Sequence, residues 1–183
     1  LGMGVVDKSK PVILCIGHNV APGAEIVDYL SQQGLYGRVE VAGICCTAHD
    51  LARYSTGTKI IGPLSRQLMF VRSGVADVII LDQECIRSDI IDEAKKVGTR
   101  VITTIDQLLA GLPNRTYSDS SIAVDELASG KNLAVHIRNP AKVAEVAVKT
   151  SLAVAPSRRS QLIQDEQKIL ETAALCTLCR RCR

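Results

Sequence analysis

The sulfur chemistry of this 183-residue chain is concentrated in two places, and the clearer one is the C-terminus. Cys176, Cys179 and Cys182 fall within the last eight residues, in the sequence CTLCRRCR. Their Cys-x-x-Cys-x-x-Cys spacing opens the bacterial ferredoxin pattern, in which a tight loop turns thiolates toward corners of one 4Fe–4S cubane. That pattern continues with three residues and a fourth cysteine before proline, so we expect the natural chain to continue beyond Arg183. A zinc knuckle or a redox-active tail is the alternative interpretation.

A second group of potential ligands is spread over the first half of the chain. His18 lies in GHNVAPG, Cys45 and Cys46 are adjacent in AGICCTAHD, and Cys85 ends DQEC. Adjacent cysteines rarely form a disulfide, because their Cα atoms lie closer than disulfide geometry prefers. Thiolates with one imidazole suit zinc or iron–sulfur chemistry, but zinc normally takes close pairs such as Cys-x-x-Cys. Ligands that follow separate strands favour a larger inorganic cluster.

The other chemically capable side chains are assigned mainly structural roles. Cys15 lies inside an aliphatic run and is expected in the core, because free cysteine is among the most buried residue types. His136 lies in a late strand and is expected to be structural. Arg66 and Arg72 are expected to serve structure, for example by pairing with acids. For His49 a hydrogen bond beside the double cysteine and a role at a helix start both stay open.

These candidate ligands must be positioned by an alternation of short aliphatic runs and helical stretches. Strands are predicted over residues 11–17, 38–44, 58–61, 76–81, 100–103 and 133–137. Helices are predicted over 24–33, 48–54, 64–72, 89–97, 122–129, 141–155 and, after Pro156, 160–175. Repeated βα units predict a Rossmann-like, doubly wound parallel α/β sheet. We expect this domain to span residues 1–155, and residues 156–183 to form a helical connector into a truncated ferredoxin-like segment.

Composition narrows the class of protein further. Aromatic residues make up 3% of the chain and Trp is absent, so the core must be aliphatic, as in buried parallel sheets. The net charge of +3 is spread along the chain without an RNA-binding aromatic motif, which argues against nucleic acid as a partner. No GxGxxG or Walker motif is present, so a nucleotide cofactor fits poorly.

The cellular location follows from what the sequence lacks. No run of 18 apolar residues and no signal-peptide pattern occur, so we expect a cytoplasmic protein with no membrane contact. Seven cysteines without an export signal favour metal binding over disulfides. The chain begins with Leu1 instead of an initiator Met, which suggests an excised segment.

Together, these sequence blocks resemble one enzyme family. GHNVAPGAEIVDYL, VAGICCTAHD, GPLSRQLMFVRSGVADVIILDQECIR and the terminal CTLCRRC are similar to the nickel–iron–sulfur carbon monoxide dehydrogenases, of the type found in the archaeal acetyl-CoA decarbonylase/synthase complex. The resemblance implies reversible oxidation of carbon monoxide with water to carbon dioxide, two protons and two electrons. Nickel would bind the carbon, and a pendant iron would bind hydroxide, because a metal lowers the pKa of bound water.

The resemblance also implies roles for individual residues. His18 and Cys46 would ligate the pendant iron of the nickel-containing C-cluster, and Cys45 would be its close neighbour or a ligand in another state of the cluster. Cys85 would hold one iron of the cubane portion. A further 4Fe–4S electron-transfer cluster would be ligated by the tail residues Cys176, Cys179 and Cys182.

Partners and activity follow from the same resemblance. We expect contacts with the rest of the same polypeptide, a homodimer, other subunits of the decarbonylase/synthase complex, and ferredoxin as the electron partner. The family's remaining cluster ligands and its lysine and histidine acid–base groups are absent from this segment, so we expect it to be inactive alone. Two alternatives remain: a Rossmann-like metal-binding interaction module with a zinc or single-cluster tail, and an electron-transfer protein.

Overall fold

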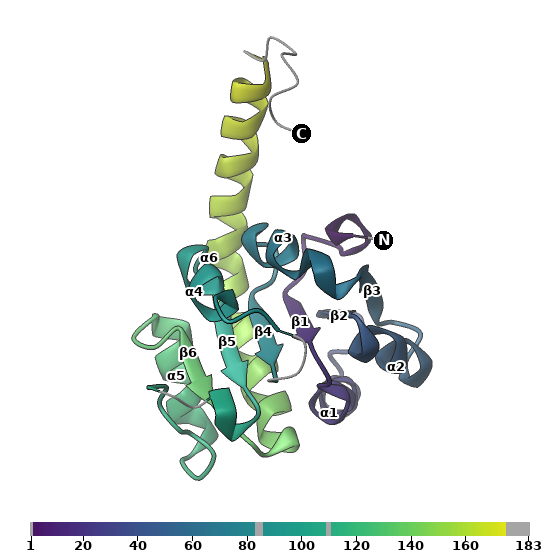
Figure 1. Ribbon diagram of the computed structural model, residues 1–183, viewed down its shortest axis with the longest axis vertical. Helices are drawn as coiled ribbons and strands as arrows, with labels where there is room; N and C mark the ends of the chain where they lie inside the picture. The colour runs from purple at the N-terminus through teal and green to yellow at the C-terminus, as the bar shows by residue number, and fades with distance from the viewer. Residues whose placement is uncertain (1, 83–85, 109–110, 175–183) are drawn as a thin grey trace.

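The computed structural model describes residues 2–82, 86–108 and 111–174 (Figure 1). Within these residues, one parallel sheet has the strand order β3-β2-β1-β4-β5-β6. Its strands are β1 (Val12–Ile16), β2 (Glu40–Ile44), β3 (Lys59–Gly62), β4 (Val78–Leu81), β5 (Arg100–Thr103) and β6 (Ala134–His136). This is the strand order of the doubly wound Rossmann fold, so the predicted fold class is confirmed.

Helices cover both faces of the sheet. They are α1 (Val20–Gln32), α2 (Cys46–Tyr54), α3 (Gln67–Arg72), α4 (Ile90–Lys96), α5 (Ser120–Ser129) and α6 (Pro140–Ala174), with short 3-10 turns η1 (Met3–Val5), η2 (Leu64–Arg66) and η3 (Asp106–Leu108). Buried side chains of α1, α5 and α6 share one core cluster with Ile13 and Cys15 of β1. Buried side chains of α3 and α4 share the other cluster with Leu14 and Ile16. The strand therefore sends alternate side chains into two cores.

The central strands are aliphatic because they are buried on both sides. β1 reads VILCI and β4 reads VIIL, and every residue of both strands is buried. Cys15 is fully buried within β1, and this burial raises the pKa of its thiol to about 12. The expectation that Cys15 belongs to the core is therefore confirmed.

The helix after Pro140 differs from the prediction. Two helices were expected on either side of Pro156, but the structure has one helix, α6, with Pro156 in its interior. An interior proline removes one helical hydrogen bond and clashes with the preceding turn, which normally ends or kinks a helix. Here Arg158, two residues further on, is buried and donates to the carbonyl oxygens of Gly74 and Gly98. These contacts hold the helix on the sheet beyond the proline.

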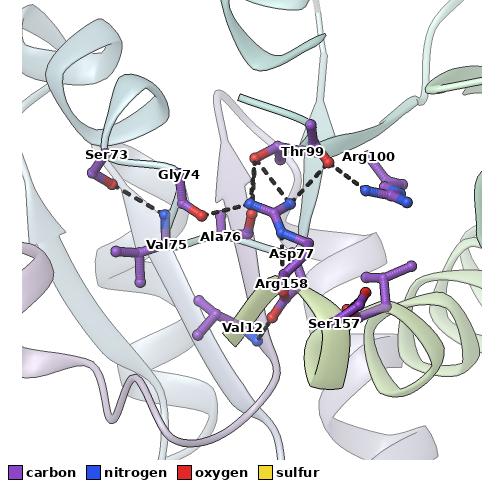
Figure 2. Close-up of polar contacts among 12 residues, drawn as sticks. Val12, Ser73, Gly74, Val75, Ala76, Asp77, Thr99, Arg100, Ser157 and Arg158 are labelled. Carbon is purple, nitrogen blue, oxygen red and sulfur yellow. Dashed lines mark hydrogen bonds and ion pairs between the residues drawn. The ribbon is translucent and has the colours of Figure 1, made fainter. Parts of the chain in front are cut away.

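Arg158 also meets a buried carboxylate at the amino end of the sheet (Figure 2). Its Nε lies 3.5 Å from Oδ1 of Asp77, and its terminal nitrogens lie 3.3 and 3.2 Å from Oγ1 of Thr99. The other oxygen of Asp77 accepts a hydrogen bond of 2.8 Å from the backbone N–H of Val12. One guanidinium therefore joins α6 to β1, β4 and β5 at once. Beyond this anchor, the last part of α6 extends away from the sheet (Figure 1).

Arg72 confirms its predicted structural role. Its Nε lies 2.6 Å from Glu93 of α4, and Lys96 lies 2.6 Å from the other oxygen of the same carboxylate. The hydrogen bonds from Arg72 and then Lys96 lower the pKa of Glu93 to about 2. This cluster ties α3 to α4 on the face opposite α1 and α6.

Candidate metal centre

The sequence-predicted ligands of the first half follow strands at the carboxyl edge of the sheet. His18 lies two residues after the end of β1, and Cys45 and Cys46 come directly after β2, which is the neighbouring strand. In open α/β sheets ligands collect at this edge, near the point where the strand order reverses. Here the order reverses between β1 and β4. The topology therefore places His18 and the double cysteine at the same edge of the sheet, and their role as ligands stays a prediction.

The backbone at His18 is held by a neighbouring carboxylate. The His18 side chain is exposed, while its backbone N–H donates a hydrogen bond of 2.5 Å to Asp82, the residue after β4. Gly17 has a φ of +99°, and a Cβ atom added there would lie 2.0 Å from Oδ1 of Asp82. Only glycine fits both the backbone angle and the space. Asp82 thus packs against the turn that presents the imidazole.

Asn19 fixes the other side of the same turn. It is the N-cap residue of α1, a position where asparagine usually binds its own helix, but its side chain makes no such bond. Instead, its amide nitrogen donates to the carbonyl oxygens of Ile16 at 2.7 Å and Ile80 at 3.3 Å, and its oxygen accepts from Thr104 at 2.9 Å. Asn19 is 1% exposed. It therefore locks the ends of β1, β4 and β5 together.

The double cysteine sits in a strained strand-to-helix turn. Among the described residues, Cys45 is the one non-glycine residue with positive φ, at 65°. Such outliers are uncommon and often mark functional sites. Because the chain changes direction at Cys45 alone, α2 begins at Cys46, two residues earlier than predicted. The two Sγ atoms lie 3.8 Å apart, and Cys46 is exposed.

The start of α2 also favours negative charge. Cys45 and Cys46 occupy the N-cap and first position of a nine-residue helix, where the positive end of the helix dipole lies. Thiolate ligands carry negative charge, and the partial positive charge at the start of α2 stabilises it. Cys45 and Cys46 are therefore in a position that favours the thiolate form needed to bind a metal.

The described residues do not by themselves form a complete metal-ligand group. Residues 2–82, 86–108 and 111–174 contain no group of three or more His, Cys, Asp or Glu side chains that could hold a metal ion. Cys85, Cys176, Cys179 and Cys182 lie outside the described residues, so their predicted roles stay predictions. His49 is exposed on α2. The donor chemistry, two thiols and an imidazole at one edge, fits an iron–sulfur or nickel–iron–sulfur centre completed by other ligands.

Several positioning residues were missed by sequence reasoning. Asn19, Asp82, Thr47 and Thr104 are polar residues at or just after strand ends, and all four make hydrogen bonds between segments. The available signal was a polar residue directly after an aliphatic run. That signal does not identify a partner, because the bonds of Asp82 with His18, of Thr47 with Gly17 and of Thr104 with Asn19 join residues 64, 30 and 85 positions apart.

His136 is structural, as expected. Its ring is fully buried at the end of β6, with Nδ1 3.0 Å from Oγ1 of Thr103 and Nε2 3.2 Å from Oδ1 of Asp106. Arg138 also pairs with Asp106. Burial lowers the pKa of His136 below its usual 6.5, although Asp106 acts in the opposite direction. The native state therefore favours the neutral imidazole.

This burial predicts a pH dependence of stability. Since the folded pKa of His136 is lowered, the unfolded chain binds the proton more readily, and the free energy of unfolding should fall as pH drops below about 6.5. Denaturant unfolding between pH 5 and 8 should show this loss, and His136→Gln should flatten it. His49→Gln, at an exposed histidine, is the matched control and should leave the slope in place. An unchanged slope in His136→Gln would contradict the assignment.

No helix among the described ranges has both the length and the apolar character to cross a bilayer.

The chain is a parallel Rossmann-like α/β domain with an imidazole and two adjacent thiols at the carboxyl edge of its sheet, which are residue types that commonly bind metals. A profile of the Prismane/CO dehydrogenase family matches residues 1–170, and the chain belongs to this family. It is 49% identical over its full length to the alpha subunit of the acetyl-CoA decarbonylase/synthase complex of Methanothermobacter thermautotrophicus. It is 46% identical over its full length to the corresponding subunit of Methanocaldococcus jannaschii. The chain spans about a quarter of the length of these relatives, 24% and 23%.

Solved structures agree in fold. A nickel-free carbon monoxide dehydrogenase from Thermococcus sp. AM4 matches 87% of this chain, over 24% of its own length, with a TM-score of 0.59 and 25% identity. Carbon monoxide dehydrogenase IV from Carboxydothermus hydrogenoformans matches 87% of this chain over 23% of its own, with a TM-score of 0.59 and 17% identity. The second likeness concerns the fold alone.

Proposed function

We propose that this chain is the Rossmann-like segment of an acetyl-CoA decarbonylase/synthase alpha subunit, which oxidises carbon monoxide with water to carbon dioxide, two protons and two electrons, reversibly. The observation that supports it is the placement of His18 and the Cys45–Cys46 pair after adjacent parallel strands, on a chain 49% identical to such a subunit. The whole reaction requires parts of the polypeptide outside this chain. The segment contributes ligands to a shared centre and is not expected to turn over alone.

The proposed ligands divide between two clusters. His18 and Cys46 would bind the pendant iron of the C-cluster, Cys45 would lie beside it, and Cys85 would bind an iron of the cubane portion. When bound, the nickel–iron–sulfur cluster supplies Lewis-acid and redox chemistry. The chain's own residues orient the donors: Asp82 and Asn19 hold the turn on either side of His18.

The remaining parts of the proposal concern electron transfer and assembly. Cys176, Cys179 and Cys182 would ligate a 4Fe–4S cluster that carries electrons toward ferredoxin. Partners would be the rest of the polypeptide, a second copy of it and the other subunits of the complex. The division into residues 1–155 and 156–183 also stays a proposal, although Arg158 shows that α6 is bound to the sheet at least two residues past the proposed boundary.

Replacement of the ligands in the full-length subunit tests this function. Cys46→Ala and His18→Ala, produced anaerobically with nickel and iron, should lose nickel and carbon monoxide oxidation by more than the roughly 10–100-fold typical of a lost second-shell partner. Cys15→Ala is the matched control, because Cys15 lies in the core of the adjoining strand, and it should keep both. Wild-type nickel content and activity in Cys46→Ala would reject the proposal, and zinc as the main bound metal would favour an interaction module instead.

A further inference from the structure

The turn that carries His18 is tied to the segment that carries Cys46 by one buried hydroxyl. Thr47 directly follows Cys46, and its Oγ1 donates a hydrogen bond to the carbonyl oxygen of Gly17, which directly precedes His18. Thr47 is fully buried, so water does not compete for this bond. The bond therefore joins the two ligand-bearing segments through residues that are adjacent to the ligands themselves.

A second tie joins the His18 turn to the segment after β4. Asp82 is 6% exposed and accepts the backbone N–H of His18, while its carboxylate fills the space beside the Cα atom of Gly17. Asp82 lies three positions before Cys85 in the sequence. Gly17 is thus held at its carbonyl by Thr47 and at its Cα face by Asp82.

The result is an exposed imidazole on a backbone that buried contacts hold from several directions. Gly17 before it and Asn19 after it are both fixed, whereas the His18 ring itself is exposed. Metal ligands depend on such supporting contacts, because their loss leaves the ligand present but misplaced. A threonine at the second position of a helix could bind its own backbone, but this one donates to Gly17, the residue after the neighbouring strand β1.

We propose that Thr47 and Asp82 are positioning residues for metal binding, and that they fix His18 relative to Cys46 and to the end of β4. This inference rests on the proposed function, in which His18 and Cys46 bind one iron. Thr47 is expected to have the larger effect on the relative position of His18 and Cys46, because its hydroxyl makes the hydrogen bond that links the two segments directly. Asp82 instead sets the orientation of the turn.

The test uses the full-length subunit loaded with its metals. Thr47→Val removes the hydroxyl at nearly constant shape, and Thr47→Ser restores it. Thr58→Val is the matched control: Thr58 is also buried and donates 2.8 Å to the carbonyl of Ser55, but it lies beyond the opposite end of α2, away from the ligands. Two readouts are the rate at which a chelator removes iron and the electron paramagnetic resonance spectrum of the reduced protein.

Thr47→Val is expected to lose iron about 10–100-fold faster and to change the spectrum. Thr47→Ser and Thr58→Val are expected to match the wild type in both. The inference is overturned if Thr47→Val keeps the wild-type rate and spectrum, or if Thr58→Val changes them equally, which would indicate a loss of global stability. Cys46→Ala distinguishes failure of the proposed function from failure of the positioning role. If both Cys46→Ala and Thr47→Val keep the cluster, the proposed function fails. If Cys46→Ala loses the cluster and Thr47→Val keeps it, only the positioning role fails.

Discussion

Arg158→Met should lower the free energy of unfolding by about 3–5 kcal/mol, the cost typical of breaking a buried ion pair by removing one partner. Asp77 is fully buried and would lose the guanidinium beside it, which leaves a buried carboxyl group without its cationic partner from α6. The carbonyl oxygen of Gly74 would also lose a donor (Figure 2), and so would that of Gly98. Chemical denaturation of the chain, monitored by circular dichroism, measures the change.

Arg72→Met is the matched control for this prediction. The Arg72–Glu93 distance of 2.6 Å is shorter than the 3.5 Å between Arg158 and Asp77, but Arg72 is 55% exposed. Exposed pairs typically contribute less than about 1 kcal/mol, so burial and not distance should decide the ranking. Asp77→Asn with Arg158→Met should cost less than the sum of the single changes, with coupling of about 0.5–3 kcal/mol. Equal losses of stability in Arg158→Met and Arg72→Met would show that burial does not decide the ranking. Strict additivity in the double variant would show that Arg158 and Asp77 are not coupled.

Gly17→Ala should destabilise the chain by about 2–5 kcal/mol. A non-glycine residue at φ +99° costs about 1–2 kcal/mol, and displacing Asp82 from the His18 N–H adds about 1–3 kcal/mol for a buried hydrogen bond. The clash is severe because the added Cβ would lie 2.0 Å from the Asp82 oxygen. Thermal or denaturant unfolding measures the loss, and in the full-length subunit the same change should lower metal content.

Gly37→Ala isolates the backbone-strain part of that effect, so the difference between the two variants gives the steric part. Gly37 has a φ of +78°, but nothing lies within 4 Å of an added Cβ atom. Its substitution should therefore cost only the backbone strain of about 1–2 kcal/mol. If Gly17→Ala and Gly37→Ala are equally destabilised, the contact between Asp82 and Gly17 adds no steric cost. The proposal that Asp82 supports the backbone at His18 would then be contradicted.

The sheet was predictable from sequence because its central strands are buried on both faces. A fully aliphatic run such as VILCI or VIIL indicates a strand of this kind wherever it occurs between helical segments. The alternation of strands and helices then fixes a parallel topology. Consequently, the sequence alone was enough to predict that His18 and the double cysteine lie at the carboxyl edge of the sheet.

Local rules failed where tertiary contacts override them. The helix predicted over residues 24–33 begins instead at Val20, because Pro22 lies in its first turn, where proline is tolerated. Gly23 is needed there, since a Cβ atom would lie 2.8 Å from Leu51 of α2. Likewise, the rule that proline ends a helix is overridden at Pro156 by the anchor at Arg158, whose partners lie 59 to 84 positions away in sequence.

The support of the candidate site was equally hidden from sequence. Asn19, Thr47 and Asp82 look like ordinary polar residues at strand ends or a helix start. Their roles depend on which strands are neighbours, because Asp82 reaches His18 only when β4 lies beside β1. Sequence patterns specify the ligands more readily than the residues that orient them.

The central claim is that the carboxyl edge of this sheet holds iron through His18 and Cys46. The most direct measurement is the crystal structure of the full-length subunit, purified anaerobically, with anomalous scattering collected at the iron absorption edge. We expect an iron atom within bonding distance of both the Cys46 sulfur and a ring nitrogen of His18. Anomalous density for iron elsewhere, with neither side chain in contact with a metal, would contradict it.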